Sequence, residues 1–221
     1  MFRATRLLTH SYASLREIEA NVGLAPGRVT VAYPGVPDPF GTVAPRERER
    51  LVLTVGAVAW LTYERKGLRP FVEAAAFVPD AEFVVAGEWL DRAVDLLREL
   101  GASNVSFTGR LERSELDELF ARASVYVQAS RHEAFGMSLA EAMLAGCIPV
   151  ATRAGSLPEV VGDVGVQTDD SSPQALAEAI GRALELGEDE RIRARERVLE
   201  QFPVDARRRA LHEAVRELLD R

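Results

Sequence analysis

Lysine is almost absent from this sequence: of its 27 basic residues only Lys66 is a lysine, and the others are arginine. The single cysteine, Cys147, excludes an internal disulfide framework and a cysteine-rich metal site. No apolar run is long enough for a membrane span, and the first residues lack the apolar stretch of a secretory signal. A net charge of −7 argues against nucleic-acid binding. We therefore expect a cytoplasmic protein with no nucleic-acid partner and, at most, peripheral contact with the inner face of a membrane.

What the sequence does contain is an alternation of short β-branched apolar runs with helical patterns, which is typical of a parallel sheet covered by helices on both faces. The predicted strands are 51–55, 82–85, 105–108, 125–128, 148–152 and 164–167. The predicted helices are 68–77, 91–100, 112–121, 137–144 and 173–186. Several strands end in glycine or another small residue, which lets a ligand approach the carboxyl edge of the sheet. The sequence thus predicts an α/β fold with a Rossmann-like, doubly wound parallel sheet.

Both ends of the chain differ from this α/β pattern. Residues 1–45 contain two short strand-like runs, a helical pattern and a linker rich in proline and glycine. Residues 188–221 are helical and rich in Glu and Arg, which fits either a helix that docks on a membrane or partner or, more simply, a solvated helix with i,i+4 ion pairs. We therefore predict an N-terminal appendage and linker (1–45), a Rossmann-like domain (46–187) and a C-terminal helical tail (188–221).

The segment 130–141 carries the clearest chemical signal. A predicted strand leads into it, and a predicted helix leaves it at Met137, so free backbone N–H groups at the start of that helix form an anion site. Gly136 lets a ligand approach the backbone, and Glu141 can accept hydrogen bonds from vicinal hydroxyls such as those of a ribose. The spacing of Glu133 and Glu141 is no evidence by itself, because Glu188 and Glu196 repeat it in the tail. The strand–loop–helix setting carries the prediction.

Other short motifs accompany this segment in a fixed order. They are Leu53-Thr54-Val55-Gly56, Arg65-Lys66-Gly67-Leu68, Val84-Val85-Ala86-Gly87, Val105-Ser106-Phe107-Thr108-Gly109 and Gly155-Ser156-Leu157-Pro158-Glu159-Val160-Val161. Together with Glu133 to Glu141 they resemble the C-terminal, donor-binding domain of GT4-type retaining glycosyltransferases, whose GT-B fold has two Rossmann-like domains. The resemblance runs from about residue 50 to 186. It implies one half of a GT-B fold that binds a UDP- or GDP-sugar and serves transfer of a hexosyl group to an acceptor.

The resemblance also implies roles for individual residues. Glu133 would be the catalytic residue, lying beside the donor sugar in an orienting and electrostatic role. The expected donor-binding residues are Gly56, Arg65, Lys66, Arg110, Leu111, Phe135, Gly136, Met137, Ser138, Leu139 and Glu141. In this set Lys66 would neutralise the diphosphate, residues 135–139 would present backbone amides, Glu141 would hold the ribose hydroxyls, and Arg110 and Leu111 would border the base. No metal or cofactor is expected, because a cation and a helix N-terminus can stabilise the leaving group.

One position departs from the family pattern. Ala57 follows Gly56 where the family usually has an arginine that shares the diphosphate, and the loop 58–64 is longer than usual. Arg65 is the candidate substitute. His132 is either a proton carrier or, more simply, a loop residue that fixes Glu133 or packs beside it.

Residues 1–45 resemble only the end of an acceptor-binding N-terminal domain. We therefore expect the chain to work with such a domain or with a partner chain. The alternative is a stand-alone nucleotide-sugar binding module without transferase activity. A nicotinamide-dependent oxidoreductase is disfavoured, because no G-x-G-x-x-G follows the strand at 51–55.

Overall fold

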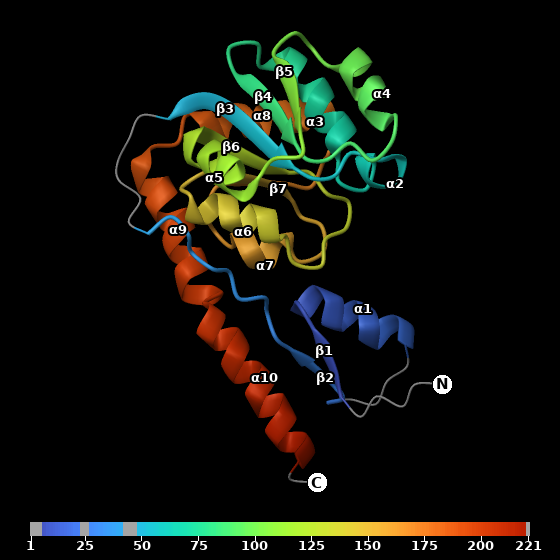
Figure 1. The fold of residues 1–221 in the computed structure, drawn as a ribbon, viewed down its shortest axis with the longest axis vertical. Helices are drawn as coiled ribbons and strands as arrows, with labels where there is room; N and C mark the ends of the chain where they lie inside the picture. Colours follow the sequence, from blue (N-terminus) through green and yellow to red (C-terminus); the bar gives the residue numbers. More distant parts are fainter. Residues whose placement is uncertain (1–5, 23–26, 42–47, 220–221) are drawn as a thin grey trace.

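The computed structural model describes residues 6–22, 27–41 and 48–219. Figure 1 shows an α/β body, a small appendage beside it, and a long C-terminal helix that runs from the body along the appendage. The domain boundary predicted at residues 45 and 46 lies outside the described residues.

The body is built on a six-stranded sheet in which all neighbouring strands are parallel. Its strands are β3 (Glu49–Val55), β4 (Glu82–Ala86), β5 (Val105–Gly109), β6 (Ala123–Gln128), β7 (Ile148–Thr152) and β8 (Val166–Thr168). They lie in the order β5-β4-β3-β6-β7-β8. The chain therefore builds outward from β3 to β5 and then returns to place β6 on the other side of β3. This reversal makes a topological switch point between β3 and β6.

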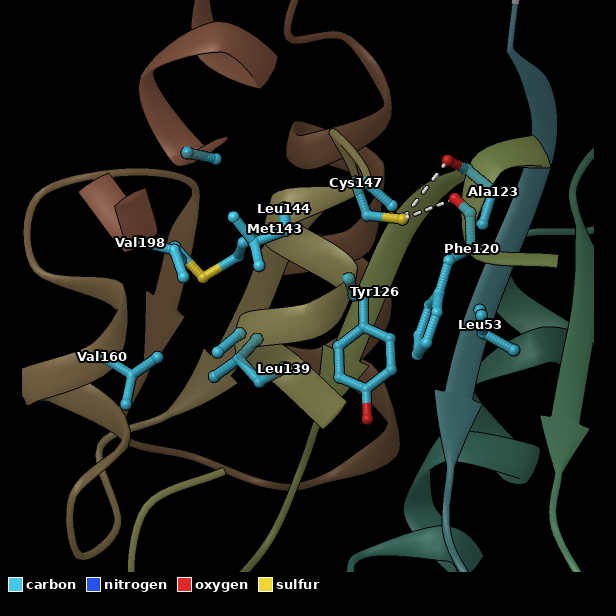
Figure 2. Close-up of a cluster of buried hydrophobic side chains, with 14 of the residues drawn as sticks. Leu53, Phe120, Ala123, Tyr126, Leu139, Met143, Leu144, Cys147, Val160 and Val198 are labelled. Carbon is cyan, nitrogen blue, oxygen red and sulfur yellow. Dashed lines mark hydrogen bonds between the residues drawn. The ribbon is translucent and has the colours of Figure 1, made fainter. Parts of the chain in front are cut away.

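Helices cover both faces of the sheet, which explains why β6 and β7 are buried along their whole length. One face carries α3 (Leu68–Ala74), the 3-10 turn η1 (Ala75–Phe77), α4 (Ala93–Leu100) and α8 (Pro173–Leu184). The other carries α5 (Arg113–Arg122), α6 (Met137–Leu144), α7 (Leu157–Val161) and α9 (Glu188–Gln201). In Figure 2, Leu139 and Met143 of α6 lie between Tyr126 of β6 and Val198 of α9. The predicted doubly wound, Rossmann-like sheet is confirmed.

The C-terminal tail forms two helices rather than one, α9 and α10 (Val204–Leu219), which meet at Phe202 and Pro203. The prediction of a solvated tail is wrong for α9. Its Ala194 and Val198 belong to the core of the body, and its arginines 191, 195 and 197 donate hydrogen bonds to main-chain carbonyls of the body. An apolar stripe hidden among charged residues thus makes α9 part of the domain.

The appendage consists of two parallel strands, β1 (Leu7–Thr9) and β2 (Val29–Val31), and the helix α1 (Tyr12–Val22). Glu159 of α7 joins it to the body, because its carboxylate accepts hydrogen bonds of 2.9 and 2.6 Å from the first two backbone N–H groups of α1. The same carboxylate accepts a 2.6 Å hydrogen bond from the Tyr33 hydroxyl, and α10 donates to the Ala32 carbonyl through Arg207. Both the body and α10 therefore hold the appendage in place.

Candidate functional site

A cavity of about 550 Å³ opens beside the switch point, between the body and the appendage. Ligands of open parallel α/β sheets bind at such a point, beyond the carboxyl ends of the strands. The cavity is lined by His10, Pro34, Gly35, Lys66, Gln128, Glu133, Ala134, Phe135, Gly136, Met137, Ser138 and Arg207. The loop between β6 and α6 thus supplies most of the body side of the cavity, together with Lys66.

Lys66 reaches the cavity from the loop that follows β3, past the short helix α2 (Trp60–Tyr63). A Cβ atom on Gly56 would lie 3.3 Å from Lys66 Cδ, so glycine leaves the space in which the lysine side chain lies. Gly67 has a φ of +67°, and its ideal Cβ would lie 2.0 Å from the Ala129 carbonyl oxygen. The two glycines flanking the loop therefore allow Lys66 to approach the end of β6.

The Lys66 ammonium faces Glu133, with 3.6 Å between Nζ and Oε2. The two side chains are 23% and 15% exposed, so their attraction is screened less than that of a surface ion pair. In this arrangement the cavity contains a cation that can meet an anionic group, and Lys66 is the counter-charge of Glu133.

A chain of buried polar groups also reaches Glu133 from β6. The Tyr126 hydroxyl donates to Gln128 Oε1 at 3.0 Å, and Gln128 Nε2 donates to Ser130 Oγ at 2.7 Å. Ser130 Oγ and Gln128 Nε2 lie 3.3 and 3.5 Å from Glu133 Oε2 and donate to it. Burial raises the pKa of Tyr126 above its usual range, so its hydroxyl stays protonated as the donor at the start of this chain. These contacts fix the Glu133 carboxylate in one orientation.

The main chain of Glu133 is held as firmly as its side chain. Ser156 donates to the Glu133 carbonyl from its backbone N–H at 3.0 Å and from its hydroxyl at 3.1 Å. Gly155, with a φ of +55°, passes so close that its ideal Cβ would lie 2.3 Å from that carbonyl oxygen. The Gly155-Ser156 pair is thus the support on which the Glu133 loop rests.

The N-terminus of α6 faces the cavity beside Glu133. Gly136, at the N-cap position with a φ of +96°, offers no side-chain cap, so the backbone N–H groups of Met137, Ser138 and Leu139 are available to a ligand. The Phe135 ring packs 5.0 Å from the Phe202 ring, and Leu139 is fully buried. Of these two residues only the backbone can therefore contribute to the site.

Glu141 lies farther along α6, and its carboxylate is already in contact with Arg113 of α5. The distance between Arg113 Nη1 and Glu141 Oε1 is 2.7 Å, and the Glu141 side chain is 14% exposed. Glu141 is thus next to the site but not among the residues that line the cavity.

Three of the other expected donor-binding side chains also lie outside this cavity. Arg65 is exposed, and its carbonyl accepts a hydrogen bond from the Arg131 backbone. Arg110 is 74% exposed and lies 3.8 Å from Glu88, while Leu111 packs against the core. His132, for which the sequence left two roles open, also lies away from the cavity. It is 54% exposed, and its Nδ1 lies 3.4 Å from a carboxylate oxygen of Glu17 in α1, so it faces the appendage.

Several residues of the site were given no role from the sequence. Gln128 and Ser130 are polar residues at the end of an otherwise apolar strand, and that change in polarity was a usable signal. His10 and Arg207 line the cavity from segments about 200 residues apart in sequence, so no local motif could have indicated them.

The described residues contain neither a metal-binding cluster nor a membrane-spanning helix. Among residues 6–22, 27–41 and 48–219, no three His, Cys, Asp or Glu side chains come together in a way that could hold a metal ion. Within the same residues, no helix has both the length and the apolar character needed to cross a membrane.

Comparison with known proteins identifies the family. The profile of the family described as glycosyl transferases group 1 matches residues 40–199, well over half of the chain. The chain belongs to the group 1 glycosyltransferases. The resemblance inferred from the sequence motifs is thereby confirmed at the level of the family.

Two curated relatives of the chain are longer than the chain itself. It is 33% identical to the MMP alpha-(1->4)-mannosyltransferase of Mycolicibacterium hassiacum over 72% of the chain and 39% of the relative. It is 31% identical to the D-inositol 3-phosphate glycosyltransferase of Corynebacterium urealyticum over 84% of the chain and 50% of the relative. The chain therefore spans half or less of these curated relatives.

Solved structures show the same fold in larger proteins. The sucrose-phosphate synthase of Thermosynechococcus elongatus superimposes with a TM-score of 0.85 and 24% identity, over 99% of this chain and 59% of that one. HepE of Anabaena, solved in complex with UDP and glucose, superimposes with a TM-score of 0.83 and 22% identity, over 96% of this chain and 63% of that one. The chain thus has the fold of one Rossmann-like half of a GT-B protein, with a helical C-terminal end.

Proposed function

We propose that this chain is the donor-binding half of a retaining glycosyltransferase that transfers a hexosyl group from a UDP- or GDP-sugar to an acceptor. The observation that carries the proposal is the Lys66–Glu133 pair beside the free amides of α6 at the switch point. The structural neighbour HepE, solved with UDP and with UDP-glucose, supports a nucleotide-sugar as the ligand.

The proposed diphosphate site combines two sources of positive potential. The N-terminus of α6 offers backbone N–H groups and the positive end of the helix dipole, and Lys66 adds a full charge. Both are already in place before the ligand arrives, so they stabilise the charge that develops on the leaving diphosphate without reorganising. A metal ion is not required by this mechanism.

Glu133 is proposed to orient the donor sugar. It is the one carboxylate among the described residues that line the cavity, whereas the covalent route of retaining glycosidases uses two carboxylates close together. Its Oε2 is engaged by Lys66, Gln128 and Ser130, which suits a fixed acceptor of hydroxyl hydrogen bonds better than a nucleophile. In the proposed reaction the bond from the sugar to the phosphate breaks, the acceptor oxygen bonds to the same face of that carbon, and the acceptor proton passes to the departing phosphate.

The nucleoside is proposed to extend from the cavity along α6. Glu141 would accept hydrogen bonds from the ribose hydroxyls, and Arg110 and Leu111 would border the base. Arg65 remains a proposed second cation for the diphosphate, in the role left open by Ala57.

The test is ligand-induced stabilisation of the 221-residue chain. A UDP-sugar or GDP-sugar at 100 times its Kd should stabilise the fold by about 2.7 kcal/mol and raise its melting temperature. Glu141→Ala should abolish the shift, whereas Arg122→Ala, which removes an ion pair with Glu49 at the far end of α5, should leave it unchanged. Absence of a shift with every UDP- and GDP-sugar would overturn the proposal.

A further inference from the structure

Arg113 joins two carboxylates from neighbouring helices at the edge of the site. Its Nη1 lies 2.7 Å from Glu141 Oε1 on α6, and its Nη2 lies 2.8 Å from Asp117 Oδ1 one turn along α5. The Arg113 side chain is 53% exposed, whereas Glu141 and Asp117 are 14% and 24% exposed. The guanidinium therefore covers the Glu141 carboxylate from the solvent side.

This contact restricts what Glu141 can do. A free glutamate side chain samples many rotamers, and each one that a ligand must exclude lowers the affinity. With Oε1 hydrogen-bonded to Arg113, the carboxylate is held in one orientation, and Oε2 is the oxygen that this contact does not engage. The hydrogen bond to Glu141 also raises the pKa of the Arg113 guanidinium, which therefore stays charged at any physiological pH.

We propose that Arg113 is a positioning residue for ribose recognition: it holds Glu141 through Oε1 so that Oε2 is preorganised to accept from a ribose hydroxyl. The inference rests on the proposed function, in which Glu141 binds the ribose, and adds a residue outside the family motifs. Arg113 acts through Glu141 and has no contact with the nucleotide of its own.

A double-mutant cycle on nucleotide affinity tests this role, with UDP and GDP as probes and their 2′,3′-dideoxy forms as controls. Calorimetry would give Kd for the unchanged chain, Arg113→Ala, Glu141→Ala and the double variant. Arg113→Ala should weaken binding of the better ribonucleotide about three- to tenfold, the range expected for releasing one ordered side chain, and should leave its dideoxy form unaffected. In the Glu141→Ala background, Arg113→Ala should have no further effect.

The control variant is Arg122→Ala, which removes an exposed arginine from the same helix, and it should change neither affinity. An unchanged or tighter Kd for Arg113→Ala, or an equal loss in both backgrounds, would overturn the positioning role while the proposed function stands, provided that Glu141→Ala alone weakens binding. If the unchanged chain binds neither UDP nor GDP, both the positioning role and the proposed function are wrong.

Discussion

At the scale of single residues, the one lysine of the sequence, Lys66, is also the cation of the candidate site. Every other Lys or Arg position is arginine, yet the residue paired with Glu133 in the cavity is lysine. A compact ammonium on a flexible stem fits the narrow path beside Gly56, where a Cβ atom would already touch Lys66 Cδ. The composition alone did not show whether lysine is required at position 66 or occurs there by chance. The placement of Lys66 explains why a lysine serves there.

Replacing Lys66 by alanine should separate diphosphate binding from nucleoside binding. Loss of one charge-assisted contact of about 1.5–3 kcal/mol should weaken UDP or GDP roughly 10- to 100-fold, and the corresponding nucleoside should bind as before. Calorimetric titrations would measure both. Arg65→Ala is the informative comparison: an equal loss there would identify Arg65 as a second cation, and an unchanged diphosphate affinity in Lys66→Ala would contradict the role of Lys66.

Cys147 should be chemically inert in the folded chain. Its thiol is fully buried and donates toward the Phe120 and Ala123 carbonyls, as Figure 2 shows, and burial raises its pKa to about 11. The pKa of an unfolded cysteine is about 8.5. The neutral buried thiol therefore stabilises the fold fully below that pH, and this contribution is lost as the pH rises toward 11. Reaction with a thiol reagent at pH 8 should therefore be slow and limited by unfolding. Fast labelling without urea would contradict this.

At the scale of helices and strands, the sequence predicted best the bounds of elements that are flanked by glycine. The helix α6 has the predicted bounds because Gly136 and Gly146, with φ values of +96° and +87°, flank it. By contrast α2 and α7 have only four and five residues, which is too short to show a helical period.

In the candidate site, too, some residues could be predicted from local sequence signals and others could not. Lys66 and Glu133 lie in local motifs and were predicted. The contact of Arg113 with Glu141 and the entry of Arg207 into the cavity arise only when distant segments pack together, so sequence patterns could not show them.

The support beneath the Glu133 loop gives a prediction at this scale. Gly155→Ala would place a side chain at a positive φ and push against the Glu133 carbonyl, so it should destabilise the fold by at least about 1–2 kcal/mol and weaken nucleotide binding. Gly181→Ala is the matched control, because Gly181 lies inside α8 with open space around it and alanine should be neutral or stabilising there. Thermal melts and UDP or GDP titrations would compare them; equal behaviour of the two variants would refute the supporting role of Gly155.

At the scale of the whole molecule, the chain has the size of about half of its relatives. We expect the purified chain to bind a nucleotide-sugar yet to transfer no sugar by itself, because the assay would lack the part of its relatives that the chain does not match. A transferase assay on the chain, alone and with a separately expressed acceptor domain of a relative, would measure this. Robust transfer by the chain alone would contradict the half-enzyme prediction, and donor binding that never leads to transfer would favour the stand-alone binding module.

The chain passes from the appendage to the body between β2 and β3, and at Phe202 it leaves the body again as α10, which runs along the appendage. Of the residues that line the cavity, His10 follows β1 of the appendage and Arg207 lies on α10, whereas Lys66 and Glu133 belong to the body. Because the body, the appendage and α10 all contribute lining residues, the size of the cavity depends on how the appendage and α10 pack against the body, whereas the Lys66–Glu133 pair lies wholly within the body.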